Sequence, residues 1–202
     1  LSRLIKKGFS VAICEQTETP ENMKIKGLKG PLKREVVRVI TPGTIIEDNL
    51  LESKTFNFLG SLFVNKNNFS ISWVDVSTGL FLTNSFVCSN DIELKYKIEN
   101  VLARSYFSEL LVEKDFDMNL ISTQFRYIAR PLEKDLFSYE NNFQELKELY
   151  PNHEISFFKQ FSETQIISSG ILITYLKKSF CGRLPKLKDL TLEKNKSFME
   201  ID

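Results

Sequence analysis

The hydrophobic and polar positions divide the chain into a short N-terminal part and a longer α/β part. A basic helix end closes at Gly8, and the alternating residues Phe9 to Ile13 predict a strand. The valine-rich run Glu35 to Ile40 predicts a second strand, which a Thr-Pro-Gly turn ends. A polar, turn-rich segment lies between the two strands and indicates an exposed loop.

Three strand-like runs follow at residues 56–64, 69–76 and 80–86, and short turns join them. This spacing is typical of consecutive hairpins and predicts an antiparallel meander. The mixed, acidic residues before the first run indicate a linker at 45–54. A helix capped by Asn90 should then pack on the meander through residues at helical spacing, namely Leu94, Ile98, Val101 and Leu102.

The second half of the chain alternates strand and helix patterns. A short apolar run at 110–112 predicts a buried strand, and the strand-helix-strand order implies one parallel neighbour in the sheet. A helix over 143–150 should end at Pro151. Ser162 and Gln165 form a capping-box pattern before a helix whose apolar face comprises Ile167, Ile171, Leu172, Tyr175 and Leu176. The predicted fold class is therefore α/β with a mixed sheet.

Composition narrows the function classes. There are 27 basic and 26 acidic residues, so the net charge is near +1 and any contact with nucleic acid must be local. Cys14, Cys88 and Cys181 form no CxxC pair, which favours a reducing, cytoplasmic setting. His153 is the only histidine, which excludes a multi-histidine metal site, and it is expected to lie in a solvated turn.

The sequence contains no apolar run of about 18 residues, as a membrane span would require, and no signal-peptide pattern. It begins at Leu1 within a helical pattern and without a methionine. We therefore expect a fragment whose first helix started earlier.

Two sequence blocks carry a family resemblance. Phe9-Ser10-Val11-Ala12-Ile13-Cys14-Glu15-Gln16 is followed by Gly30-Pro31 and then by Arg34-Glu35-Val36-Val37-Arg38-Val39-Ile40-Thr41-Pro42-Gly43-Thr44. In order and spacing these blocks resemble the end of the mismatch-binding domain of the MutS family. Asp75-Val76-Ser77-Thr78-Gly79 resembles the start of that family's connector domain, and Phe198-Met199-Glu200-Ile201-Asp202 resembles the start of its core, or lever, domain.

The resemblance implies a domain division and a function. It implies the C-terminal part of an α+β mismatch-binding domain at 1–44, a linker at 45–54, a ribonuclease-H-like connector domain at 55–188 and the start of the core domain at 189–202. Members of the family are expected to dimerise around mismatched double-stranded DNA, to use ATP and Mg²⁺, and to signal to a MutL-like partner. The chain itself would then be a non-catalytic link with no cofactor of its own.

Two motifs of that family receive no role here. The phosphate-binding pattern GxxxxGK[ST] is absent from the sequence, so no ATP site is assigned. The Phe-x-Glu mismatch wedge is expected before Leu1. The triplets that begin at Phe107, Phe143 and Phe161 lie in the connector region, and no wedge role is assigned to them.

The strongest charge bias lies between residues 24 and 38, with six basic residues and one acid, Glu35. The candidate phosphate contacts are Lys24, Lys26, Lys29, Lys33 and Arg34, and Arg38 is the sixth base. Lysines on such a loop can supply sequence-independent affinity for DNA. The alternative is a solvated basic loop. Glu15 and Gln16 could also reach the duplex, although hydrogen bonding at a strand end is the favoured interpretation.

Asp75 and the phenylalanines admit further alternatives. A ribonuclease-H-like nuclease would place a metal-binding aspartate near Asp75, but two-metal cleavage needs several convergent carboxylates. The nearest in sequence are Glu93, Glu109, Glu113 and Asp115, and none falls in a nuclease pattern. The favoured role of Asp75 is to cap backbone amides of a turn. The 17 phenylalanines alternate along strands, which favours core packing over base stacking. An inactive product of a split gene is the remaining possibility.

Overall fold

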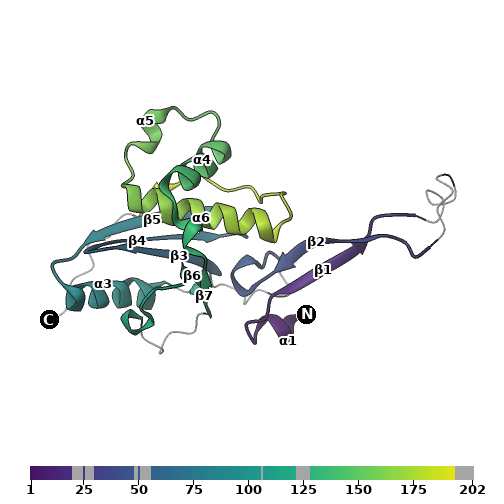
Figure 1. The fold of residues 1–202 in the computed structure, drawn as a ribbon, viewed down its shortest axis with the longest axis horizontal. Coiled ribbons are helices and arrows are strands. Elements are labelled where there is room, and N and C mark those ends of the chain that lie inside the picture. Colours follow the sequence, from purple (N-terminus) through teal and green to yellow (C-terminus); the bar gives the residue numbers. More distant parts are fainter. Residues whose placement is uncertain are drawn as a thin grey trace.

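The chain forms a hairpin arm that projects from a layered α/β body (Figure 1). The structure is a computed structural model, and it describes residues 1–19, 25, 30–47, 50, 56–105, 107–121 and 128–193. The arm consists of strands β1 (Val11–Gln16) and β2 (Arg34–Ile40), preceded by the short helix α1 (Ser2–Ile5). No helix in these ranges is long and apolar enough to cross a membrane.

The first strand starts two residues later than predicted, at Val11 rather than Phe9. The reason lies in the helix end. Gly8 adopts a φ of 86°, as its predicted role as the left-handed stop requires, and its amide donates to the carbonyl of Ile5. The amide of Phe9 donates to the carbonyl of Leu4, so this residue completes the helix cap and its ring is exposed.

The two strands of the arm pair antiparallel, from Val11 opposite Ile40 to Gln16 opposite Arg34, with a bulge between Ile13 and Cys14. The root of the arm has a small core of its own, formed by Ile5, Ile40 and Ile45. After β2 the chain makes one 3₁₀ turn, η1 (Pro42–Thr44), which is buried against the body. The arm is therefore attached through its root, and its other end extends into solvent.

The body is built on a six-stranded sheet with the strand order β7-β6-β3-β4-β5-β8. The strands are β3 (Phe58–Asn65), β4 (Asn68–Asp75), β5 (Leu80–Val87), β6 (Phe107–Glu113), β7 (Ile128–Leu132) and β8 (Thr191–Leu192). The first three form the predicted antiparallel meander, within two residues of the expected bounds. Strand β6 lies parallel to β3, and β7 lies parallel to β6. The order β5-β4-β3-β6-β7 is the predicted ribonuclease-H-like arrangement.

Helices cover both faces of this sheet. Helix α3 (Asp91–Arg104) lies on one face, and its cap is confirmed because the Asn90 side chain accepts a hydrogen bond from the Glu93 amide at 2.9 Å. On the other face lie α4 (Tyr139–Leu149), α5 (Ile155–Phe158) and α6 (Glu163–Ser179) (Figure 1). Two hydrophobic clusters result, one on each side of the sheet.

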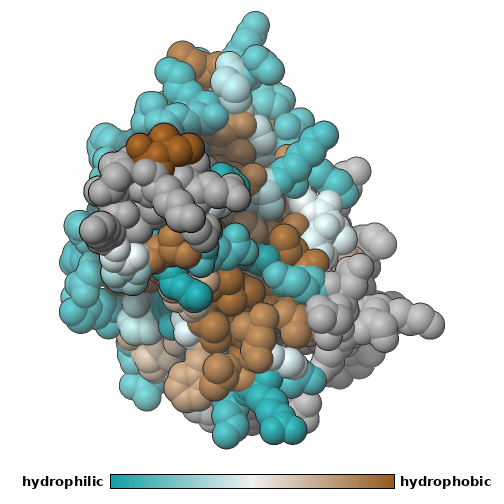
Figure 2. Space-filling view, turned by 90° about the vertical axis from the view of Figure 1, so that its right-hand side faces the viewer, coloured by the Kyte–Doolittle hydropathy of each residue, from teal (hydrophilic) through white to brown (hydrophobic). Residues whose placement is uncertain are grey.

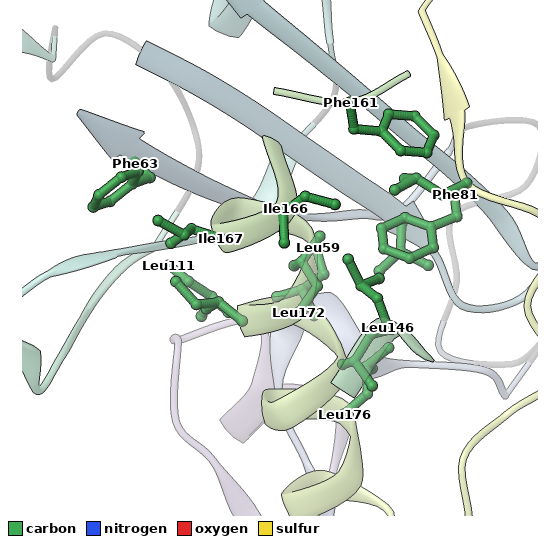
Figure 3. Packing of buried hydrophobic residues seen from close by; sticks show 14 of the residues in the cluster. Leu59, Phe63, Phe81, Leu111, Leu146, Phe161, Ile166, Ile167, Leu172 and Leu176 are labelled. Atoms are coloured by element: carbon green, nitrogen blue, oxygen red, sulfur yellow. The ribbon is translucent and has the colours of Figure 1, made fainter. Parts of the chain in front are cut away.

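The capping box of α6 is confirmed: Ser162 accepts from the Gln165 amide, and the Gln165 side chain accepts from the Ser162 amide at 2.9 Å. The prediction of a single apolar face was too narrow. Figure 3 shows side chains of α6, including Ile166 and Leu172, among the core residues between this helix and the sheet. Most residues from 165 to 176 are buried, because α4 covers the side of α6 that faces away from the sheet.

Hydroxyl groups also hold α6 on the sheet. The hydroxyl of Ser72 on β4 is within hydrogen-bond distance of Ser168 (2.7 Å) and Ser169 (2.8 Å), and it donates to Thr83 on β5 at 2.8 Å. All four residues are fully buried. Because small side chains allow close approach and each hydroxyl has a partner, burial of these polar groups is compensated.

Several elements were not predicted from sequence. They are β7, β8, α5, the first turn of α4 and three 3₁₀ turns: η1, η2 (Met118–Leu120) and η3 (Lys134–Phe137). Residues 188–193 run beside β5, and Leu190 is buried in the main core. The sheet thus extends past residue 188, the predicted end of the connector domain. The boundary itself stays a prediction.

Candidate nucleic-acid arm and its anchor on the body

Two of the candidate phosphate contacts lie at the described end of the arm. The Lys33 ammonium forms an ion pair of 2.6 Å with Glu35, and both side chains are about half exposed. The hydrogen bond that Lys33 donates to the Glu35 carboxylate raises the pKa of Lys33. Arg34 is exposed at the start of β2, opposite Gln16. The other three candidates, Lys24, Lys26 and Lys29, lie outside the described residues.

Arg38, the sixth base of this stretch, is engaged within the molecule. Its guanidinium pairs with the carboxylate of Glu47 and donates to the carbonyl of Thr44 at 2.9 Å. The same group lies 4.6 Å from the centre of the Phe180 ring, at the end of α6. The Cys181 thiol donates to the carbonyl of Val36 at 3.4 Å. These contacts attach the arm to the body, and Arg38 is not available for phosphate.

The central contact between arm and body is the carboxylate of Glu109, a fully buried residue of β6. Its Oε2 accepts hydrogen bonds from the Thr41 hydroxyl at 2.5 Å and from the Gly43 amide at 3.1 Å. Its Oε1 accepts from the Arg130 guanidinium and from the Tyr175 hydroxyl at 2.8 Å. One oxygen therefore binds the chain just after the arm, and the other binds β7 and α6.

The carboxylate of Glu109 and its four donors, Thr41, Gly43, Arg130 and Tyr175, form the Glu109 node. Its surroundings favour the charged form of Arg130 and the protonated phenol of Tyr175. For Arg130, burial works against the charged form, but the attraction and hydrogen bond of Glu109 outweigh it and raise the pKa. For Tyr175, burial and then the negative charge of Glu109 raise the pKa well above the ordinary value of 10.0, so its phenol remains a donor. Both oxygens of Glu109 are satisfied, and a buried carboxylate bonded in this way rigidifies the structure around it, whereas the buried Nη2 of Arg130 has no hydrogen-bond partner among the described residues.

A cavity of about 280 Å³ lies beside the node, between the arm and the body. The arm contributes Val39, the segment just after it contributes Thr41, and the body contributes Arg130, Leu132 and Tyr175 among others. Figure 2 views the molecule from the side of the arm and shows hydrophobic residues gathered near the middle of this face, bordered by hydrophilic ones.

Asp75 acts as a turn residue, as the favoured interpretation held. Its Oδ1 accepts from the Ser77 amide at 3.0 Å and from the Ser77 hydroxyl at 2.7 Å. Of the other carboxylates considered, Glu93 pairs with Lys97 at 2.6 Å, and Glu109 belongs to the node described above. Within the described ranges no three His, Cys, Asp or Glu residues are grouped as metal ligands would be.

The remaining sequence candidates mostly take structural roles. Gln16 donates to the carbonyl of Glu18 at 2.8 Å, which confirms its strand-end role. Most phenylalanines of the described strands are buried, as core packing requires. Phe56 was predicted within the first strand but lies before β3, where it is 51% exposed and stacks on Phe58 with ring centres 5.0 Å apart. His153 does lie in a turn, but it is more constrained than predicted: its Nε2 lies 3.0 Å from Asp189, and its ring stacks on Phe157.

The role of Glu109 was not predicted from the sequence. There this residue stands only as the end of a Phe-x-Glu triplet and as a carboxylate near Asp75. The available signal was a single acid inside an apolar strand that is covered on both faces, because such a charge must find partners. In the Phe107 triplet both the ring and the carboxylate are buried, which agrees with assigning no wedge role to it.

The fold and the site define a two-part protein in which a hairpin arm is anchored on a mixed-sheet α/β domain. Comparison with known families matches residues 1–49 to the model described as MutS domain I and residues 57–188 to MutS domain II. The chain belongs to the MutS family, as the sequence resemblance had indicated.

Curated relatives align with the whole chain. DNA mismatch repair protein MutS of Wolbachia pipientis wMel is 35% identical over 205 residues, covering 100% of this chain and 23% of the relative. Proteins of the same name are 33% identical in Ehrlichia chaffeensis, with 25% of the relative covered, and 35% identical in Ruegeria pomeroyi, with 23% covered. In both cases the match again covers 100% of this chain. The chain thus spans about a quarter of the length of the curated relatives it matches.

Proposed function

We propose that this chain belongs to a DNA mismatch-repair protein and that it transmits the position of a DNA-contacting arm to a connector domain. The observation that carries the proposal is the Glu109 node, in which a carboxylate of the MutS domain II match binds the segment that leaves the arm of the MutS domain I match. Through a rigid attachment of this kind, a contact that shifts the arm also shifts the sheet to which the arm is bound.

The proposed division follows the sequence: 1–44 as part of the mismatch-binding domain, 45–54 as a linker, 55–188 as the connector and 189–202 as the start of the core domain. The matched family segments support the first and third of these assignments. We further propose a cytoplasmic protein in which ATP hydrolysis, Mg²⁺ binding and dimerisation reside in the full-length molecule, with mismatched double-stranded DNA and a MutL-like protein as partners.

The proposed DNA contacts are local and electrostatic. Lys33 and Arg34 place two positive charges at the described end of the arm, and Lys24, Lys26 and Lys29 precede them in sequence. Because the net charge is only +1, these residues must supply the attraction for phosphate themselves.

The test is fluorescence-anisotropy titration of the whole chain with homoduplex and mismatched DNA over a salt series. We expect weak binding that falls steeply with salt and does not discriminate the mismatch, as phosphate contacts alone would produce. Combined Lys33→Gln and Arg34→Gln should weaken binding and reduce the slope of log K against log [salt] by about 2.

The matched control is Lys95→Gln with Lys147→Gln, which removes the same charge from exposed positions on α3 and α4. It should leave the slope unchanged. Equal losses in both double variants, or no loss in the arm variant, would contradict the proposed contacts. A clear preference for mismatched DNA would show that a recognition element lies within this chain.

A further inference from the structure

We propose that Glu109 is a positioning residue that fixes the direction of the β1–β2 arm on the connector sheet. The inference rests on the proposed function for its DNA consequence, but its structural part can be tested without DNA. Thr41, which donates to Glu109, directly follows Ile40, the last residue of β2. Since Ile40 pairs with Val11, a shift of Thr41 moves both strands of the arm.

The two oxygens of the Glu109 carboxylate bind different parts of the molecule. Oε2 receives the hydroxyl of Thr41 and the amide of Gly43, both on the arm side. Oε1 receives Arg130 from β7 and Tyr175 from α6, both on the body side. Each side can therefore be altered without removing the partners of the other.

Glu109→Gln should break the hydrogen bonding on the arm side and keep the hydrogen bond to Arg130 on the body side. A guanidinium and a backbone amide can only donate, so the one acceptor oxygen of a glutamine can serve either Arg130 or Gly43. The charged Arg130 makes the stronger hydrogen bond, and it should hold the amide oxygen on the body side. The amide nitrogen then faces the Gly43 amide, donor against donor, and the arm root should be released.

Tyr175→Phe is the matched control. It also removes one hydrogen bond to Glu109, but on the body side, and it leaves the hydrogen bonds from Thr41 and Gly43 to Glu109 in place. A general loosening of the node would act equally in both variants. A positioning role predicts that only the arm-side change alters the direction of the arm.

The experiment measures the distance between spin labels on the arm and on the body by pulsed electron paramagnetic resonance of the whole chain. The labels are placed by Glu15→Cys on β1 and Lys147→Cys on α4, both exposed positions. Cys14→Ser and Cys181→Ser remove the exposed native thiols, and Cys88 is buried and so protected from labelling.

We expect one narrow distance distribution for the parent and for Tyr175→Phe, and a distribution at least twice as wide for Glu109→Gln. An unchanged width in Glu109→Gln, or equal broadening in both variants, would overturn the inference. If Glu109→Gln does not fold, Thr41→Val provides the arm-side test, because it removes the donated hydroxyl and keeps the side-chain shape; an unchanged width there would equally overturn the inference.

DNA binding supplies the second measurement. If only part of the population holds the arm in its binding direction, the apparent affinity falls by that fraction, so Glu109→Gln should bind about three- to tenfold more weakly. The salt slope should stay the same, because the phosphate contacts are intact. Broadening without any loss of affinity would overturn the link to DNA. Failure of the proposed function would appear separately, as an unaltered salt slope in the Lys33→Gln, Arg34→Gln variant.

Discussion

Replacing Gly170 with alanine should destabilise the body by forcing α4 away from α6. A Cβ at this position would lie 2.4 Å from the Cβ of Asn142 and 2.6 Å from its Cα and carbonyl oxygen. Ordinary contacts between carbon atoms are about 3.5–4.0 Å, so the helices would have to separate by about 1 Å here. The obstructing atoms belong to backbone and Cβ, which cannot move aside by changing a rotamer.

The magnitude follows from two opposed effects. Overpacking of a well-packed core typically costs about 1–3 kcal/mol, and the upper end applies because helix backbones must move. Alanine in place of glycine within a helix returns about 1 kcal/mol. The net loss should therefore be about 2 kcal/mol, equivalent to a decrease in Tm of about 4–8 °C for a domain of this size.

A second consequence concerns Asn142 itself. This buried side chain donates to the carbonyls of Leu136 and Ser138, each at 2.7 Å, and displacement of α4 would disturb both hydrogen bonds. Urea and thermal denaturation followed by far-UV circular dichroism measure the effect. Lys178→Ala, at an exposed position of α6, is the control and should change stability by less than about 0.5 kcal/mol. If Gly170→Ala were as stable as the parent or more stable, the close contact would not restrain the helices and the reasoning would be refuted.

Three further outcomes are expected. Ser162→Ala should lower the free energy of unfolding by about 1 kcal/mol in urea denaturation, because it removes the cap of α6; an unchanged midpoint would contradict this. Hydrogen bonds, first that of Lys97, lower the pKa of Glu93 to about 2. The stabilisation that the Glu93 carboxylate provides is therefore present above the ordinary pKa of 4.5 and is lost as the pH falls toward 2. The difference in urea midpoint between the parent and Glu93→Gln should shrink over that range. The parent and Asp75→Asn should each have the same Tm in MgCl₂ as in EDTA. A Mg²⁺-dependent shift of Tm that occurs in the parent and is lost in Asp75→Asn would support the nuclease alternative.

The elements that the sequence predicted well are those whose signals are local. The meander of β3, β4 and β5 has two-residue alternation and short turns, and α3 and α6 have caps within four residues of their first turn. Such patterns depend on residues that are close in sequence, and in these elements the same residues also contact one another in the structure. The fold class followed from their order.

The elements that it missed depend on distant partners. Strand β7 contains Ala129 and Pro131, which are unfavourable strand residues, and it forms because β6 offers a parallel neighbour. The start of β1 was misplaced because the end of α1 uses the amide of Phe9. The role of Glu109 depends on donors 66 and 68 positions before it and on others 21 and 66 after it, which no local pattern reveals.

The short strand β8 limits where this chain can be shortened. Along β5, the Lys188 amide donates to the carbonyl of Gly79 and the Glu193 amide donates to that of Thr83, so residues 188–193 occupy hydrogen-bonding positions of an edge strand. A chain cut at residue 187 would uncover that edge and the pocket of Leu190 together. Open edges pair with other chains, so such a truncated protein should self-associate or precipitate, although all the helices that the structure describes would still be present.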